Sequence, residues 1–404
     1  MKHRTIQVFL SILLMLVPTT KSIRVAVLGS SVSGATVARS LADRGMKVTV
    51  FEAGHGIGGR TSTRITRDDK KYQFDHGGQY ISKPKTVVFQ NALDQWKQDG
   101  WVKHWTGNFG TATGTTKSDD PVSLADIEVV ASEKKERWVV YPGMHSICRN
   151  LLHHENIQVT LHSRADAIYK NEDGKTPKWD LVHGKNKSLL GTFDWLVVTD
   201  RNSAAHFRKD LLNANVDEFR KGAVRRIQSI KSLTAMVVFE KPLEFDMDGI
   251  EFDAKHTNGA FGSLGWAARD TSKPGRDRED GAECWVLQSH PDAARETLKG
   301  MKNNIGEIRE KAKDVLLKDF IKSIPILAGK KEMDLPPIVH AVGHRWGAAF
   351  PLPCQAYIEN ESQLIAEKHF VACGDYFGTL SGRIEGAYLS GLSAADQICQ
   401  NSHN

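Results

Sequence analysis

The sequence predicts an α/β protein whose main sheet is built from both ends of the chain. Near the N-terminus, an apolar strand over 23–28 leads through a glycine-containing turn into a helix over 35–44 and a second strand that ends in an acid. Near the C-terminus, a strand over 370–373 ends in Gly-Asp and precedes a helix over 384–398. Short β-branched runs that alternate with helical segments are typical of a parallel sheet covered by helices.

The N-terminal strand, turn, helix and strand form a βαβ unit of the Rossmann type, which binds the ADP half of a dinucleotide. Gly29 permits the tight turn, and Gly34 lets the helix pack closely against the first strand. Glu52 ends the second strand, where an acid accepts hydrogen bonds from ribose hydroxyls. Ser31 is the departure, because its Cβ narrows the position where a second glycine brings backbone close to phosphate. An ordinary strand–turn–helix without a ligand is the alternative.

A second glycine-rich loop follows and favours FAD over NAD. Gly59 and Arg60 lie in the run Gly-His-Gly-Ile-Gly-Gly-Arg, and arginine is well suited to phosphate oxygens. This run resembles the Gly-Gly-Arg motif of the flavin amine-oxidase superfamily. The segment 74–80, which contains Gly78 and Gln79, resembles the stretch that runs beside the flavin ring in those enzymes.

The C-terminal segment supplies the other half of the expected flavin site. Asp375 can accept hydrogen bonds from ribityl hydroxyls, and a helix that begins near Ile384 can direct its N–H groups at the carbonyl edge of the flavin. Gly374 precedes the aspartate, at the end of the strand. Residues near 163–165 are expected, by analogy with the family, to lie behind the adenosine.

Three further segments resemble the renalase-like branch of this superfamily: the Pro-Gly-Met turn at 142–144, the stretch 261–291 and His-Arg-Trp at 344–346. The resemblance implies a discontinuous Rossmann-type FAD-binding domain and a second, α+β substrate domain. We expect the first to comprise 23–82, 137–202 and 336–404, and the second 83–136 and 203–335.

The predicted cofactor-binding residues are Gly29, Ser31, Gly34, Glu52, Gly59, Arg60, Gly78, Gln79, Gly374, Asp375 and Ile384. No catalytic acid or base is assigned, because oxidation by a flavin depends on positioning the substrate more than on an ionised side chain. His76, Gln79 and Trp346 are the motif-borne residues expected nearest the flavin, in structural or orienting roles.

Two expectations concern residues outside the cofactor motifs. Lys273 and Arg276 are expected to be solvated in an exposed loop of the second domain. Trp96, Trp101 and Trp105 are expected in a core rather than in a substrate pocket.

The resemblance implies an FAD-dependent oxidoreductase that takes hydride from a small substrate. Renalase-like proteins oxidise isomers of dihydronicotinamide dinucleotides with oxygen as the acceptor, whereas other relatives oxidise amines or desaturate rings and polyenes. We expect noncovalent FAD, because Cys354 and Cys373 lie outside the attachment motif. An alternative of a different class is a flavin-free binding protein, since escort and dissociation-inhibitor proteins for prenylated GTPases share the fold. Ser31 could then mark the loss of flavin binding.

Composition and the N-terminus bear on partners and location. The formal charge of +6 is spread without a basic block, so nucleic-acid binding is not expected.

Lys2 and Arg4 precede an apolar run over 8–17 that is short for a membrane span. Residues 1–22 therefore indicate a secretory signal peptide, with an organelle leader or an uncleaved anchor as alternatives. A secreted chain could form one or two disulfides among its five cysteines, which show no metal-site spacing, and carries glycosylation sequons at Asn186 and Asn360.

Overall fold

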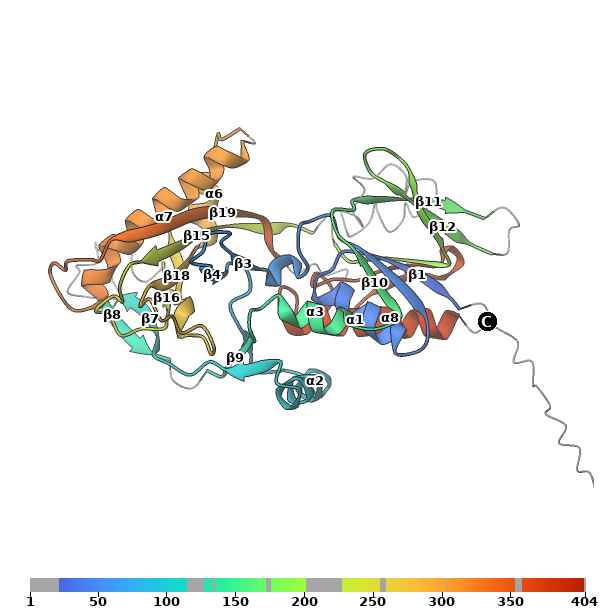
Figure 1. The fold of residues 1–404 in the computed structure, drawn as a ribbon, viewed down its shortest axis with the longest axis horizontal. Coiled ribbons are helices and arrows are strands. Elements are labelled where there is room, and N and C mark those ends of the chain that lie inside the picture. Colours follow the sequence, from blue (N-terminus) through green and yellow to red (C-terminus); the bar gives the residue numbers. More distant parts are fainter. Residues whose placement is uncertain are drawn as a thin grey trace, which may run out of the picture.

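The computed structural model describes residues 22–114, 127–132, 135–171, 176–200, 227–254, 259–302, 304–352 and 358–402. Except for Ser22, the predicted leader lies outside these ranges, as does Cys354. Figure 1 shows two lobes joined side by side. Each lobe is organised around one large sheet.

The first lobe contains a six-stranded sheet in the order β10-β2-β1-β14-β21-β20. Its first five strands are parallel, and β20 is antiparallel to β21. The strands span Arg24–Leu28 (β1), Lys47–Phe51 (β2), Ile157–Thr160 (β10), Trp195–Val198 (β14), Gln363–Ile365 (β20) and Phe370–Ala372 (β21). Segments from the start, middle and end of the chain thus pair in one sheet, which confirms the predicted α/β fold with a discontinuous Rossmann-type arrangement.

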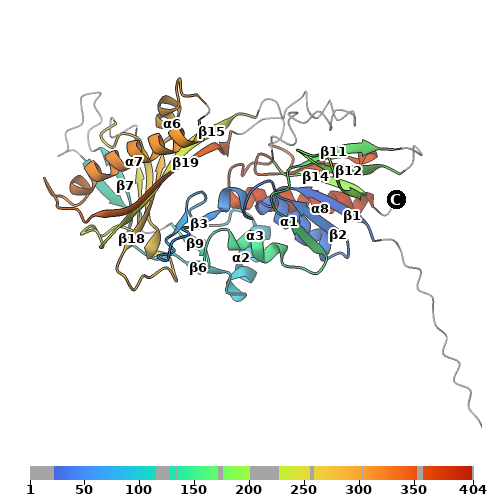
Figure 2. The same ribbon diagram turned by 45° about the horizontal axis from the view of Figure 1, so that its top comes forward.

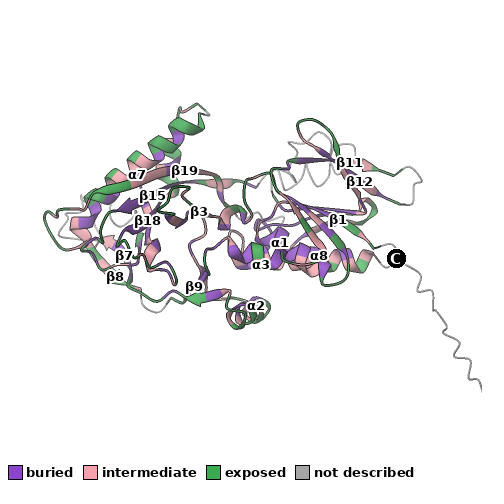
Figure 3. Cartoon of the chain, in the orientation of Figure 1, coloured by how far each residue is buried: buried purple, intermediate pink, exposed green. Residues whose placement is uncertain are grey.

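Helices cover one face of this sheet and a small antiparallel sheet covers the other (Figure 2). The helices are α1 (Val32–Ala42), α3 (Ser146–Leu152) and α8 (Ile384–Asn401), and the small sheet is β11 (Ala165–Lys170), β12 (Lys178–His183) and β13 (Leu189–Phe193). Helices α1 and α8 meet closely at Gly391, where a Cβ would lie 2.6 Å from the Ser33 carbonyl oxygen. The helix faces that meet the sheet are buried (Figure 3).

The second lobe contains a seven-stranded sheet in the order β19-β15-β18-β17-β16-β7-β8. Its neighbours are antiparallel except for β16 and β7. The strands span Phe109–Gly114 (β7), Ile127–Ala131 (β8), Ser229–Phe239 (β15), Gly249–Phe252 (β16), Leu264–Arg269 (β17), Glu283–Ser289 (β18) and Ile338–Pro351 (β19). Helices α6 (Pro291–Thr297) and α7 (Ile305–Leu327) pack on one face, as the amphipathic spacing of this region predicts.

Short elements connect the lobes. Strands β3 (Thr63–Ile65) and β4 (Gln73–Asp75) form a hairpin, and β5 (Ile81–Ser82), β9 (Arg137–Val140) and β6 (Val102–His104) form a three-stranded sheet. Helix α2 (Val87–Gln98) packs on α8, where Phe89 and Trp96 contact Tyr388. Trp96 and Trp105 are buried, as expected for core residues, and Trp101 is half-buried against the same core.

The structure corrects the predicted domain boundaries at two places. Strand β19 was expected with the first domain, but it pairs with β15 from Ser229↔Pro351 to Phe239↔Ile338 and therefore belongs to the second sheet. Helix α2 was expected with the substrate domain, but it packs on α8 of the first lobe. The local sequence of a long strand or of an amphipathic helix does not show which other elements it packs against.

The cysteines of the described region are free thiols: Cys148, Cys284, Cys373 and Cys399. Within that region, no helix is long and apolar enough to cross a membrane.

The contact between β19 and α7 depends on Gly343. A Cβ at this position would lie 1.9 Å from the Arg309 carbonyl oxygen, whereas a Cβ at Gly347 on the same strand would have only an ordinary contact at 3.5 Å. We therefore expect Gly343→Ala to lower the free energy of unfolding by about 1–3 kcal/mol, because the helix must move away from the strand. Urea unfolding measures this, and Gly347→Ala is the matched control. Equal effects of the two substitutions would contradict the packing described.

Candidate functional site

The turn after β1 has the geometry that the glycine pattern predicts. Gly29 adopts φ +105°, and a Cβ there would lie 2.5 Å from Thr199 Oγ1. A Cβ at Gly34 would lie 2.0 Å from the Gly29 carbonyl oxygen, so only glycine allows α1 to start this close to the strand. The N-terminus of α1 has no side-chain cap, which leaves its N–H groups available to an anion.

Glu52, at the end of β2, is held beside this turn. Its Oε2 accepts hydrogen bonds from the Ser30 backbone N–H (3.1 Å) and the Ser30 hydroxyl (2.6 Å), and its Oε1 accepts from the Gly54 N–H (2.7 Å). The carboxylate also lines a cavity together with Ser163 and Ala165. The chain thus orients an acid in the place where a dinucleotide presents its ribose hydroxyls.

Ser31 and Gly59 face one another across the entrance to this turn. Gly59 adopts φ +54°, and a Cβ on it would lie 3.1 Å from the Ser31 Cβ. The missing side chain of Gly59 therefore makes room for the side chain of Ser31. Although Ser31 departs from the glycine pattern, it lines both of the cavities at this site and fills neither.

The segment from His76 to Gln79 lies directly against the loop of Arg60. A Cβ at Gly77 would lie 2.0 Å from the Arg60 carbonyl oxygen, and the Gly78 N–H donates to the same oxygen (2.8 Å). A Cβ at Gly78 would meet only ordinary contacts, the nearest at 3.7 Å, and this residue lines the cavity. Packing therefore requires a glycine at residue 77. The prediction from the sequence named Gly78 and did not include this requirement.

The second sheet fixes the other side of this segment. Trp346 Nε1 donates to the His76 carbonyl oxygen (2.9 Å), and Gln288 Nε2 donates to the Gly77 carbonyl oxygen (2.8 Å). Trp266 on β17 and Gln288 on β18 are cross-strand partners, so they extend from the same face of the sheet. The face opposite α7 therefore forms a wall of the site and positions the backbone of the first lobe.

Arg60 and the C-terminal motif meet at the centre of the site. The guanidinium of Arg60 donates to Asp375 Oδ1 (2.5 Å) and to the Ala349 carbonyl oxygen (3.2 Å). Gly374 has φ +146°, and its N–H donates to Ser390 Oγ (2.8 Å), which joins this turn to α8. The N-terminus of α8 at Ile384 has no side-chain cap and lines the cavity.

Two adjoining cavities occupy the space between these elements, with volumes of about 520 and 400 Å³. They share Ser31, Arg60, Thr199, Trp346 and Asp375. The first extends toward Glu52, and the second extends between the lobes. The residues of the second cavity that carry an aromatic ring are Tyr80, Phe89, Trp266, Trp346 and Phe350.

The eleven predicted site residues therefore mostly converge. All of them except Gly34 and Gly374 line at least one of the two cavities. These two glycines instead allow the close backbone approaches next to the cavities. Thr199, Tyr80 and Trp266 also line the cavities but were not selected from the sequence. Thr199 was detectable from its position, since it directly follows the strand that pairs with β1.

Two histidines behind the site, His76 and His344, are neutral at pH 7. Burial lowers the pKa of His76 to about 4, with Arg64 adding to the effect, and burial lowers the pKa of His344 to about 3. His76 stacks on Trp346 with ring centroids 5.2 Å apart, and it does not line either cavity. It supports the wall from behind, which fits the structural role expected for it. In the described ranges, no group of three His, Cys, Asp or Glu side chains is placed to hold a metal ion.

The expectation for Lys273 and Arg276 is wrong. Both side chains are buried, with exposed fractions of 1% and 7%, and both form ion pairs with Asp75 and Asp270. The sequence shows a basic Lys-Pro-Gly-Arg turn, but it does not show that both cations form ion pairs with Asp75, almost 200 residues earlier in the chain.

Comparison with known proteins agrees with this geometry. Residues 27–96 match the model of an NAD(P)-binding Rossmann-like domain. The whole chain is similar in fold to an oxidoreductase from Methanosarcina mazei, with a TM-score of 0.65 at 11% identity, over 93% of this chain and 100% of the other.

A protein from Exiguobacterium sp. 255-15, provisionally described as a protoporphyrinogen oxidase, gives a TM-score of 0.63 at 11% identity over 95% of this chain and 100% of the other. A putrescine oxidase variant redesigned in its cofactor binding gives 0.61 at 12% identity over 94% and 100%. The chain has the two-domain fold of these oxidoreductases. The matched N-terminal segment is of a kind that binds dinucleotides.

The buried histidine gives a prediction on pH. The unfolded chain protonates residue 76 near pH 6.5 and the folded chain only near pH 4, so the unfolded state binds more protons between these values. Stability should therefore fall by about 3 kcal/mol as the pH decreases from 6.5 to 4. His76→Phe keeps a ring against Trp346 and should remove this part of the acid dependence. Urea unfolding at several pH values measures it, and an unchanged slope in the variant would contradict the assignment.

Proposed function

We propose that this chain is a noncovalent FAD-dependent oxidoreductase that oxidises a dihydronicotinamide-type substrate, as renalase-like enzymes do, with molecular oxygen as the final acceptor. The observation that carries the proposal is the pair of adjoining cavities that meet at Arg60 and Asp375. One is suited to the ADP half of FAD, and the other has aromatic walls that suit the flavin ring together with a planar substrate stacked on it.

The residues present fit FAD. Glu52 would hold the adenosine ribose, and the uncapped N-terminus of α1 would face the pyrophosphate. Asp375 would accept hydrogen bonds from ribityl hydroxyls, with Arg60 keeping its carboxylate in place. The uncapped N-terminus of α8 at Ile384 would stabilise negative charge on the ring. Bound FAD would supply the acceptor for a hydride and pass the two electrons to oxygen, which yields hydrogen peroxide.

The second cavity supports a planar, electron-rich substrate. Tyr80 and Trp266 lie close together in its wall, with ring centroids 5.9 Å apart, and Trp346 forms part of the wall shared with the first cavity. Aromatic walls stack on planar rings and exclude water from the reacting face. Neutral His76 and His344 place no positive charge behind this wall. Orientation of the substrate, not proton transfer by a side chain, is therefore the contribution expected from this chain.

Noncovalent attachment is supported by the cysteines. Cys148, Cys284 and Cys373 are buried and line neither cavity. Burial raises the pKa of the thiols of Cys148 and Cys284 to about 12, so neither is a thiolate at neutral pH.

An absorption spectrum of the purified chain, before and after addition of FAD, tests the proposal. We expect flavin bands that remain after gel filtration, disappear from the polypeptide on denaturation, and bleach anaerobically with dihydronicotinamide isomers. Readmission of oxygen should restore the bands and release one equivalent of peroxide.

Three other outcomes would redirect the proposal. Bleaching by amines instead would keep the cofactor and replace the substrate class by that of an amine oxidase. Flavin that stays on the denatured chain would overturn noncovalent attachment. Failure to retain FAD at all would overturn the enzyme and favour a flavin-free binding protein.

A further inference from the structure

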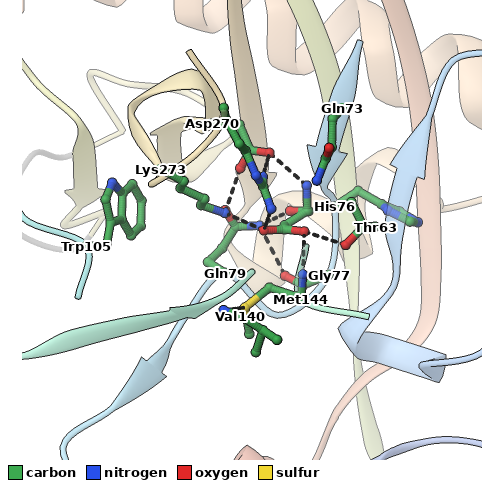
Figure 4. A network of polar contacts seen from close by, with 12 residues as sticks. Thr63, Gln73, His76, Gly77, Gln79, Trp105, Val140, Met144, Asp270 and Lys273 are labelled. Carbon is green, nitrogen blue, oxygen red and sulfur yellow. Dashed lines mark hydrogen bonds and ion pairs between the residues drawn. The ribbon is translucent and has the colours of Figure 1, made fainter. Parts of the chain in front are cut away.

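Four buried charged side chains form a closed cluster, and Figure 4 labels two of them, Asp270 and Lys273. The four are Asp75, Asp270, Lys273 and Arg276, with exposed fractions of 0%, 0%, 1% and 7%. Lys273 Nζ lies 3.0 Å from Asp75 and 2.6 Å from Asp270, and Arg276 pairs with Asp75 at 2.5 Å and also with Asp270. We call these four residues the charge quartet.

The charge quartet is balanced and joins the second sheet to the connecting hairpin of β3 and β4. Two carboxylates face two cations, so removal of one member leaves a charge without compensation in a dry environment, whereas removal of one of each sign does not. Although burial opposes it, Arg276 and Lys273 hold the pKa of Asp75 well below its usual range, so its charge persists at any ordinary pH. Asp75 comes from β4, and the other three lie after β17 of the second sheet.

Further contacts tie the charge quartet to the connecting segments. Asp75 Oδ1 accepts hydrogen bonds from Thr63 Oγ1 (2.6 Å) and from the Met144 N–H (3.0 Å), and the Asp75 N–H donates to Asp270 Oδ2 (2.9 Å). Arg276 Nε donates to the Pro142 carbonyl oxygen (3.3 Å). Figure 4 shows Thr63, Met144, Asp270 and Lys273 pointing toward one another within this network of contacts. Both side chain and backbone of Asp75 are therefore fixed.

The fixed backbone of Asp75 continues directly into the wall of the cavity. Gln79 is 7% exposed, and its Nε2 donates to the carbonyl oxygens of Asp75 and of Gly77 (3.2 Å). Since both partners are acceptors, the orientation of this amide is determined by the geometry. Gly78 and Gln79 both line the cavity that the proposed function assigns to the flavin ring.

We propose that the charge quartet is a positioning device: it holds residues 76–79 in the place where they form the wall of the ligand cavity. Lys273 and Arg276 act through Asp75 and contact neither cavity. The effect on a bound flavin rests on the proposed function, whereas the effect on the backbone of 76–79 does not.

The test compares two buried carboxylates that differ in what they position. Asp270→Asn weakens the charge quartet. Asp248→Asn weakens the ion pair of the buried Asp248 with the half-buried Arg269, which lie 2.5 Å apart and belong to the loop before β16 and to β17 rather than to segment 76–79. The double variant Asp270→Asn with Lys273→Met removes one charge of each sign, and it replaces the single variant in the test if the single variant does not fold.

Amide hydrogen exchange of a peptide covering 76–82 is measured in the chain as purified, along with thermal unfolding and FAD affinity.

We expect all variants to unfold at lower temperature, but only the charge-quartet variants to exchange faster at 76–82 and to bind FAD about tenfold or more weakly, with a shifted flavin spectrum. The same protection at 76–82 in these variants as in Asp248→Asn would overturn the proposal. If the unaltered chain binds no FAD, the proposed function fails, and the exchange measurement still decides the positioning role.

Discussion

The close approach of Gly77 to the carbonyl oxygen of Arg60 is the constraint on which the site depends. No side chain fits between them, so the loop after β2 and the segment after β4 are pressed together. This contact places Arg60 within reach of Asp375, which joins the N-terminal and C-terminal motifs. The second sheet completes the arrangement, because Trp346 and Gln288 donate to the carbonyl oxygens of His76 and Gly77. A cavity for one long ligand then results from segments that are far apart in the sequence.

The electrostatics of the site follow from backbone as much as from side chains. Two helices, α1 and α8, begin at the cavities without side-chain caps, so each presents unpaired N–H groups and the positive end of its dipole. Glu52 and Asp375 supply acceptors in the cavity beside the start of α1, whereas the start of α8 faces the other cavity. Donors at the start of α1 with carboxylate acceptors in the same cavity suit a pyrophosphate flanked by two polyhydroxylated groups.

Local sequence predicted the parts of this structure that depend on local geometry. The turn at Gly29, the acid at Glu52 and the start of α8 at Ile384 follow from residue types at fixed spacing, and the structure places the first two at one cavity and Ile384 at the adjoining one. Features that depend on distant partners were not predictable in this way. The burial of Lys273 requires Asp75, and the pairing of β19 requires β15, so neither is visible in its own segment. The role of Gly59 in accommodating Ser31 likewise appears only when the two loops meet.

Calorimetric titration of the purified chain with FAD, and separately with NAD, FMN and ADP, decides whether the two cavities together bind FAD. We expect that one FAD binds per chain, that ADP competes weakly because it fills only the cavity near Glu52, and that NAD binds far more weakly than FAD. Substitution of Glu52 by Gln should weaken FAD and ADP together. Binding of NAD in preference to FAD would overturn FAD as the cofactor, because the cavity between the lobes would then have no flavin to hold.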